Sequence, residues 1–263
     1  MSDLLPNGKQ HVSFSEVRNW VECGWRHYLQ QIKKINLDKD SEHLDFGTAV
    51  HASCENFLKT RTMDVDISLM MIVSAWEKKK FPDVEKWAQW ASDSLGEVPN
   101  FLETNFPGWE TISAEEPLYE NVENHNAYFK GFVDSVIKVP KPNGKHDIWI
   151  LDWKTAGAGG WAPDKRNDPL MHAQLSLYKY FLMKKHPEVF SSAQYVKCGF
   201  VLLKKGAKEG KRVELVPVSI GPVTMEKGLK LVTNTISGMR RGKKFKNRQS
   251  CKYCAYFETE HCT

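Results

Sequence analysis

The fold is decided by the stretch 131-GFVDSVIKVPKPNGKHDIWILDWKT-155, in which two apolar runs flank a short polar segment. The aromatic and β-branched residues of both runs are typical of β-strands. Asn143-Gly144 between them is a hairpin signal, and DIWILDWKT is apolar enough for a central strand buried on both faces. We therefore predict two neighbouring strands joined by a tight turn at the centre of a sheet.

Each of these predicted strands carries an aspartate. Asp134 and Asp152 would lie on neighbouring strands, so that their carboxylates could meet at one end of the sheet. Lys154 is two residues beyond Asp152 and projects from the same strand face. Two carboxylates beside an ammonium suit Mg²⁺ or Mn²⁺ next to a phosphate. An acid and a lysine two apart also occur by chance at strand ends, so this pair alone is a weak signal.

Such a group has a specific chemical use. A metal held by Asp134 and Asp152 would polarise a phosphodiester and lower the pKa of a bound water. Lys154 would orient that water or neutralise the developing charge. The alternative is that Asp152 and Lys154 are polar residues that simply end a strand.

Outside this stretch, helical and strand patterns alternate. The spacing of apolar residues predicts helices over 13–35, 46–58, 169–185 and 223–239, and over 64–106 in pieces divided near Pro82 and Pro99. Further strands are expected from residue 115 onward and over 195–203 and 213–220. We expect an α/β (mixed α+β) fold with a central mixed sheet flanked by helices. It would form a single domain over 1–263, with a helical insertion at 60–110.

Composition limits the class of protein. The 263 residues are 41% hydrophobic and 26% charged, which is ordinary for a globular chain. No apolar run is long enough to cross a membrane, and no secretory signal precedes the first helix, so we expect a cytoplasmic protein without a membrane partner. The net charge of +5 permits a polyanionic partner without requiring one.

Four motifs in order carry a family resemblance. They are Gly47-Thr-Ala-Val-His51, Gly131-Phe-Val-Asp134, Asp152-Trp-Lys154 and Gln174-Leu-Ser-Leu-Tyr178. Together they resemble the PD-(D/E)XK nuclease superfamily, and specifically its RecB-like branch. That branch includes the RecB nuclease domain, the AddB subunit and the CRISPR-associated RecB-like exonucleases. The resemblance runs from about residue 13 to residue 262, which is nearly the whole chain.

The resemblance implies roles for these residues. It implies that His51, Asp134 and Asp152 ligate Mg²⁺ or Mn²⁺ and that Lys154 is catalytic. Gln174 and Tyr178 would help to hold the DNA or the active-site lysine, and their spacing of four places both on one helix face. Glu55 follows His51 by one helical turn and could join the ligands or orient the histidine. Without the motif order, a buried core histidine would be the better interpretation of His51.

The cysteines suggest a second metal site. In a chain of this length without an export signal, six cysteines are unlikely to form a disulfide framework. Cys251-Lys-Tyr-Cys254 and Cys262 leave one ligand to find, and Cys23 is the candidate. In iron–sulfur members of the RecB-like branch, one cysteine before the nuclease core joins three after it around a [4Fe–4S] cluster, which these four resemble. Zinc is the alternative metal, and His261 is a neighbouring substitute for Cys262 as a ligand. Either metal would join residue 23 to the segment 245–263.

Basic residues suggest where DNA would bind. The run RRGKKFKNR over 240–248 holds six basic residues and no acid, and such a run is usually a solvated helix end. Beside a nuclease core, contact with phosphates is the better interpretation. A glycine-rich loop before residue 168 adds two more candidates. The predicted DNA-binding residues are Arg240, Arg241, Lys243, Lys244, Lys246, Arg248, Lys165 and Arg166.

The sequence thus predicts a metal-dependent deoxyribonuclease, an exonuclease acting on DNA ends or single strands. Its settings would be recombination, repair, phage replication or CRISPR adaptation, with the proteins of those processes as partners. One alternative is a non-catalytic module that binds DNA ends within a larger recombination or CRISPR-adaptation complex. Another is a structural subunit held together by zinc.

Overall fold

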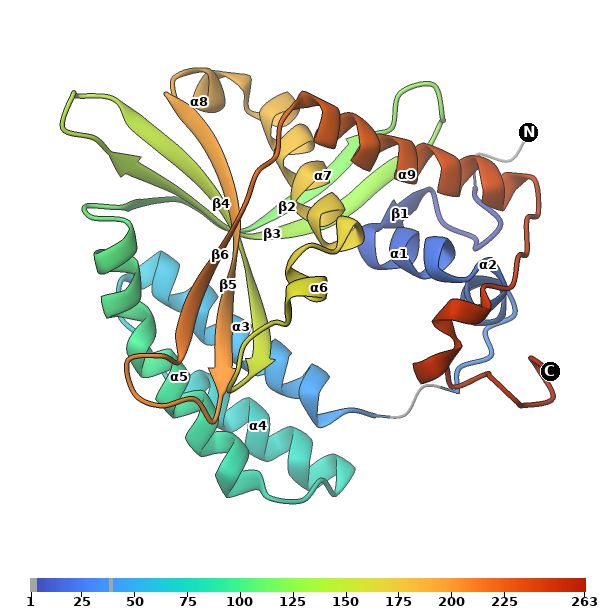
Figure 1. Ribbon diagram of the computed structural model, residues 1–263, viewed down its shortest axis with the longest axis horizontal. Helices are drawn as coiled ribbons and strands as arrows, with labels where there is room; N and C mark the ends of the chain where they lie inside the picture. The colour runs from blue at the N-terminus through green and yellow to red at the C-terminus, as the bar shows by residue number, and fades with distance from the viewer. Residues whose placement is uncertain (1–3, 38–39) are drawn as a thin grey trace. The chain divides into compact units, whose positions relative to one another are not determined.

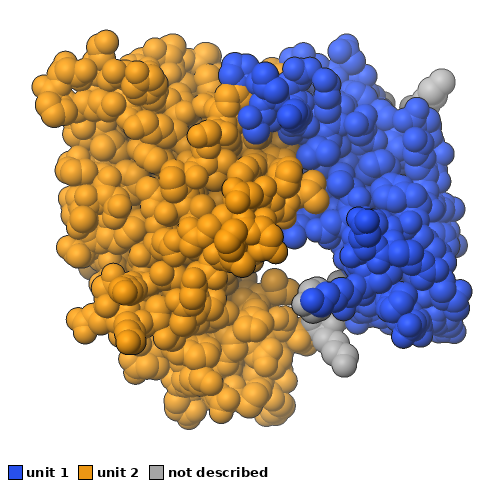
Figure 2. Space-filling view, viewed as in Figure 1, with its two compact units in different colours: residues 1–39, 117–131, 222–263 blue, residues 40–116, 132–221 orange. Residues whose placement is uncertain are grey.

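The computed structural model describes residues 4–37 and 40–263 (Figure 1). The chain divides into two compact units, shown in different colours in Figure 2. The first unit comprises residues 1–39, 117–131 and 222–263, and the second comprises 40–116 and 132–221. Each unit is described by itself below.

The second unit is built on a mixed sheet with the strand order β3-β4-β5-β6. The β3–β4 and β5–β6 pairs are antiparallel, whereas β4 and β5 are parallel and are joined through helices. Strand β2 also pairs with β3. The strands are β2 (Glu110–Asn121), β3 (Tyr128–Pro140), β4 (His146–Gly157), β5 (Tyr195–Lys205) and β6 (Val213–Val218).

Helices cover both faces of this sheet. Leu151, Trp153 and Val201 point to one face, where they share a hydrophobic core with α3 (Glu42–Thr60), α4 (Asp66–Lys79) and α5 (Val84–Asn105). Because side chains alternate along a strand, Asp152 and Lys154 point to the other face. That face is covered by α7 (Pro169–Lys185), which contacts β4 and β5. Two short helices, α6 (Pro163–Arg166) and α8 (Pro187–Ser191), flank α7.

Strands β3 and β4 separate near Asp134 and Asp152. Their pairing runs from Pro140 opposite His146 to Ser135 opposite Leu151. Asp134 is the next residue of β3 beyond this pairing, and its carboxylate accepts a hydrogen bond at 2.7 Å from the backbone N–H of Trp153, two residues beyond Leu151. A side chain therefore takes the place of a strand partner, and the buried N–H group remains satisfied.

The first unit contains both ends of the described chain. Strand β1 (His11–Ser13) runs parallel to residues 128–130 of β3. It leads into α1 (Phe14–Glu22), α2 (Gly24–His27) and a π-helical turn over Tyr28–Ile32. The unit is completed by α9 (Pro222–Arg240) and the 3₁₀ helix Arg248–Tyr253.

The sequence predicted the mixed α/β fold with a central sheet flanked by helices, and this is confirmed. The hairpin at Asn143-Gly144 and the helix over 169–185 are also where they were expected. The region 60–110 holds α4 and α5, while the assignment of a single domain with this region as an insertion stays a prediction. No helix in the described part of the chain is long and apolar enough to span a bilayer.

Two helix boundaries were wrong. The helix expected over 13–35 is interrupted at Cys23, whose backbone is extended at φ −164° and ψ 106°. Pro99 was expected to divide a helix but lies inside α5. Proline costs one intrahelical hydrogen bond. Here α5 buries Ala91, Leu95 and Leu102 in the core around that position, and this packing outweighs the lost bond.

A close contact in the first unit gives a stability prediction. A Cβ on Gly238 of α9 would overlap the Trp20 ring, and Trp20 is itself buried. We expect Gly238→Ala to lower the free energy of unfolding by about 1–3 kcal/mol through overpacking. The matched control is Gly96→Ala in α5, where a Cβ would meet no atom within 4 Å. Higher helix propensity should make this control neutral or stabilising by up to about 1 kcal/mol. Thermal and urea unfolding measure both variants, and equal effects would contradict the packing argument.

Candidate active site

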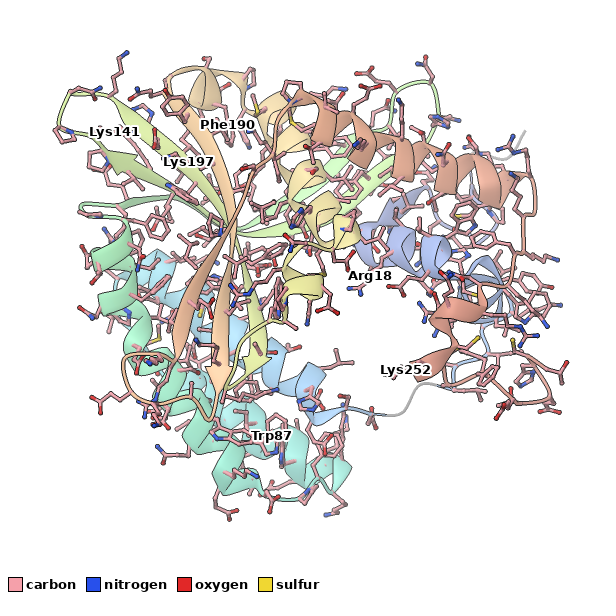
Figure 3. All side chains as sticks on the ribbon, viewed as in Figure 1. Arg18, Trp87, Lys141, Phe190, Lys197 and Lys252 are labelled. Atoms are coloured by element: carbon pink, nitrogen blue, oxygen red, sulfur yellow. The ribbon has the colours of Figure 1, made fainter. Side chains whose placement is uncertain are left out.

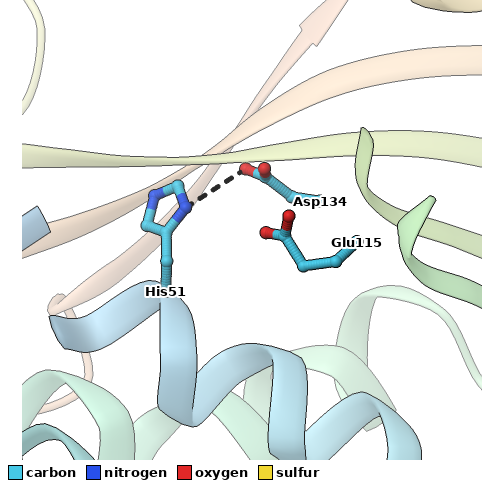
Figure 4. Close-up of side chains that lie close together, drawn as sticks. All are labelled: His51, Glu115 and Asp134. Atoms are coloured by element: carbon cyan, nitrogen blue, oxygen red, sulfur yellow. Dashed lines mark ion pairs between the residues drawn. The ribbon is translucent and has the colours of Figure 1, made fainter. Parts of the chain in front are cut away.

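Three side chains of the second unit form a group that could hold a metal ion. His51 of α3, Glu115 of β2 and Asp134 of β3 place their ligand atoms within 4.8 Å of one another (Figure 4). Nδ1 of His51 lies 3.5 Å from Oδ2 of Asp134. An imidazole with two carboxylates is a donor set that suits Mg²⁺ or Mn²⁺ better than a soft metal.

The electrostatics of the group fit a cation. Burial, followed by the charge of Asp152, raises the pKa of Asp134 well above its ordinary value. Burial, followed by the charge of Lys154, lowers the pKa of His51 to about 4. The imidazole is therefore neutral at pH 7 and keeps a lone pair for a metal. A bound cation would also relieve the repulsion between the two buried carboxylates, so the residues present fit a divalent metal.

Asp152 is held by a network from β4 and α7. Only 1% of this residue is exposed. Its Oδ1 accepts a hydrogen bond from Nε2 of Gln174 at 2.9 Å, and the same nitrogen donates to the Tyr178 hydroxyl at 3.1 Å. Its Oδ2 lies 2.5 Å from Nζ of Lys154. Burial raises the pKa of Tyr178, which therefore remains a neutral phenol. The structure thus brings together Asp152, Lys154, Gln174 and Tyr178, as the motif order indicated.

Glu115 is the residue that sequence reasoning missed. It lies outside the four motifs, within the run AEEPLYE, which carries no spacing that marks a ligand. Its backbone has φ +53°, which is uncommon for a residue other than glycine. Burial, followed by the charge of Glu55, raises the pKa of the Glu115 carboxyl. An observed outlier at a cluster of charged groups is typical of functional sites.

Glu55, which the sequence offered as a further metal ligand, is not in the compact group of ligand atoms. It forms an ion pair with Lys59 one turn further along α3. Its charge still acts on Glu115. Glu55 therefore belongs to the surroundings of the candidate metal centre, and direct ligation by it stays a prediction.

The four predicted cluster cysteines meet in the first unit. They line one pocket with an empty volume of about 320 Å³, part of which is open to solvent: Cys23, Cys251, Cys254 and Cys262. Cys23 and Cys262 are buried, and the other two are partly buried. The backbone at Cys23 is extended, and its Sγ donates to the carbonyl oxygen of Phe245 at 3.6 Å. Arg26, Lys246 and Arg248 line the same pocket and would balance the charge of thiolates.

The predicted DNA-binding residues differ in their surroundings. Arg240 donates to the backbone carbonyls of residues 125 and 126, and Arg166 donates to Glu214 and to the Trp161 carbonyl. These two guanidinium groups therefore hold loops. Lys244 lies 4.0 Å from the centre of the Tyr28 ring, and Lys165 lies 4.8 Å from that of Trp161. The other four side chains are exposed on the first unit: Arg241, Lys243, Lys246 and Arg248. DNA binding by all eight residues stays a prediction.

Comparisons with known proteins bear on the family. The family model described as the PD-(D/E)XK nuclease superfamily matches residues 11–259. Among solved structures, the chain is similar to a candidate exonuclease from Eubacterium rectale, with a TM-score of 0.60 at 12% identity over 95% of this chain and 89% of that one. The structure of SSO0001 aligns with a TM-score of 0.36 at 17% identity, over 88% of this chain and 91% of that one, which is too low for an argument about the fold. No curated protein gives a significant match.

The repulsion between the Asp134 and Asp152 carboxylates predicts that removing the charge of Asp134 stabilises the metal-free fold and weakens metal binding. Its pKa in the folded chain lies above the unfolded value, so ionisation destabilises the fold, and stability falls as the pH rises from about 4 through the raised value. We expect Asp134→Asn to raise the midpoint of thermal unfolding of the metal-free protein at pH 8 and to lose the advantage below about pH 4.

The same variant should lose metal affinity. Mn²⁺ should raise the unfolding midpoint of the wild type, and it should bind Asp134→Asn and Glu115→Gln at least tenfold more weakly. Titration calorimetry measures the affinities. Asp164→Asn, which changes an exposed aspartate in the short helix α6, is the control. Wild-type Mn²⁺ affinity in Glu115→Gln would show that Glu115 is not a ligand.

Proposed function

The chain belongs to the PD-(D/E)XK nuclease superfamily, and from this premise we propose that it is a metal-dependent deoxyribonuclease of the RecB-like type, acting as an exonuclease on DNA ends or single strands. The observation that carries the proposal is the group of Asp134, Asp152 and Lys154 beside His51 within one compact unit. The description of the Eubacterium rectale neighbour as a candidate exonuclease supports digestion from a DNA end.

The residues of the site would have different roles in phosphodiester hydrolysis. His51, Glu115, Asp134 and Asp152 would hold Mg²⁺ or Mn²⁺, which polarises the phosphate and lowers the pKa of a bound water when it is present. Lys154 carries its ammonium against Oδ2 of Asp152. From there the ammonium can neutralise the charge that develops on the phosphate oxygens.

The role of α7 is to orient these groups. Gln174 uses both hydrogens of its amide, one for Asp152 and one for Tyr178. The carboxylate of Asp152 is therefore fixed by side chains that do not titrate near neutral pH. A catalytic group must be held within a fraction of an ångström to be effective, and a locked network achieves this.

Activity assays test the proposal. We expect Lys154→Ala and Asp152→Asn to reduce kcat for DNA hydrolysis by about 10²–10³-fold with Mg²⁺ or Mn²⁺. Lys145→Ala, in the exposed β3–β4 turn, is the matched control and should keep wild-type activity. End-labelled linear DNA, single- and double-stranded, should yield short products from a terminus, whereas circular single strands should resist. A wild-type chain that binds DNA ends but cleaves nothing with any divalent metal would instead favour the non-catalytic end-binding module.

We propose further that the cysteine pocket of the first unit holds a [4Fe–4S] cluster. Four Zn–S bonds of about 2.3 Å would place sulfurs about 3.8 Å apart. Among the described residues, only His51, Glu115 and Asp134 bring three ligand atoms within 4.8 Å of one another, so no three of the four sulfurs lie that close together. A four-iron cluster bonds each thiolate to a different iron, and this wider spread supports it over zinc.

Metal analysis tests the cluster. Anaerobically purified protein should be coloured and should contain iron and acid-labile sulfide in near-equal amounts of about four per chain. Cys254→Ser should lose most of the iron and unfold at a lower temperature. Cys198→Ser, at a buried cysteine of the second unit, is the control and should keep its iron. A colourless protein with one zinc per chain would overturn the cluster and support zinc.

A further inference from the structure

A row of residues on α3 extends beyond the candidate metal centre. His43, Gly47 and His51 are spaced by four and therefore share one face of the helix. His43 and His51 are eight residues apart, which is about 12 Å at 1.5 Å per residue. At the His43 end of this row, Nδ1 of the ring lies 2.8 Å from Nζ of Lys205 on β5. All of these residues belong to the second unit.

Lys205 is a half-buried cation without a counter-charge. Its Nζ lies 5.4 Å from the centre of the Phe46 ring and 5.0 Å from that of Trp87, which is labelled in Figure 3. No carboxylate in the described part of the chain pairs with it; burial and the charge of Lys165 instead lower its pKa. Asp45, in the first turn of α3, pairs with Lys79 instead. An anion from outside the chain would stabilise a partly desolvated ammonium in this position.

Gly47 leaves the helix surface open between the two histidines. Apart from the two neighbouring residues and the backbone of α3, no described atom lies within 4 Å of the position that its Cβ would take. Glycine weakens a helix interior relative to alanine, and no neighbour in the fold requires it here. A residue that is unfavourable locally and unneeded for packing is explained when something outside the chain approaches the backbone closely.

We propose that Lys205 and His43 form a phosphate-binding subsite, and that the DNA strand held there crosses α3 at Gly47 to reach His51 and Asp134. Lys205 supplies the charge, and His43 orients its ammonium by accepting a hydrogen bond. The rise of about 12 Å along α3 is a span of very few nucleotides of a DNA strand. The phosphate bound at Lys205 is therefore close to the cleaved bond but is not the phosphate that is attacked. The subsite rests on the proposed deoxyribonuclease function.

Binding measurements locate this phosphate. Affinity for a single-stranded oligonucleotide is measured with Ca²⁺, and the cleaved bond is mapped separately with Mn²⁺. We expect Lys205→Gln to weaken binding about tenfold and to lower the slope of log affinity against log salt by about 0.7. Lys145→Gln, in the exposed β3–β4 turn, is the matched control and should bind as the wild type does.

Substituted oligonucleotides test the contact directly on the wild type. A neutral methylphosphonate is placed at each phosphate from two to five steps from the cleaved bond. At one of these positions the substitution should weaken binding to the wild type about tenfold and have no further effect on Lys205→Gln. Equal effects of every substitution on both proteins would overturn the subsite, because the lysine would then contact no particular phosphate.

The glycine gives an independent test. Gly47→Leu should hold or raise the midpoint of thermal unfolding, because leucine is the better helix former, while DNA affinity falls at least severalfold. Gly96→Leu in α5 is the control for a glycine with equally open surroundings. A Gly47→Leu variant with wild-type affinity would show that no strand crosses there.

Two outcomes distinguish an error in the phosphate-binding subsite from an error in the proposed nuclease function. If the wild type cleaves DNA but both Lys205→Gln and Gly47→Leu bind normally, the subsite is wrong and the nuclease stands. If the wild type neither binds nor cleaves DNA with any divalent metal, both are overturned.

Discussion

The hydrogen bond from the Trp153 N–H to the Asp134 carboxylate is the constraint on which the site depends. Ladder pairing of β3 with β4 stops at Ser135, so the next part of β4 has to satisfy its backbone in another way. By supplying an acceptor, Asp134 allows the two strands to part. The same carboxylate is thereby fixed beside His51, and the end of the sheet becomes a site instead of a continued ladder.

This arrangement costs stability that a cation would restore. Asp134 and Asp152 are both buried and repel each other, as the raised pKa of Asp134 shows. A core selected only for stability would pair one of them fully or replace it by an apolar residue. Keeping both, with Lys154 against one and a neutral His51 against the other, is understandable when a divalent metal is the missing partner.

Local patterns were sufficient for the strands around the turn and for the helix over 169–185, because hydrophobic periodicity and an Asn-Gly turn act within a few residues. Four motifs in order predicted that His51, Asp152 and Lys154 belong to one group, and the structure brings these side chains together, while their roles stay a prediction. Glu115 could not be found in this way: it reaches the metal group through a left-handed backbone at one strand position, and no spacing encodes that. The break at Cys23 escaped for a similar reason, since it depends on contacts with residues more than two hundred positions later.

The local sequence also does not show which basic side chains are available to bind a phosphate. The excess of five positive charges directs attention to the run 240–248, yet Arg240 of that run is engaged with backbone carbonyls. Lys205, in a strand whose sequence is largely apolar, is a half-buried cation that pairs with no carboxylate among the described residues. A lysine is available to a phosphate when no carboxylate already pairs with it. For Lys205 the groups around the ammonium are aromatic rings of α3 and α5, which are far away in the sequence. Burial among aromatic rings also holds the ammonium in one place, so that less side-chain entropy is lost when a phosphate binds.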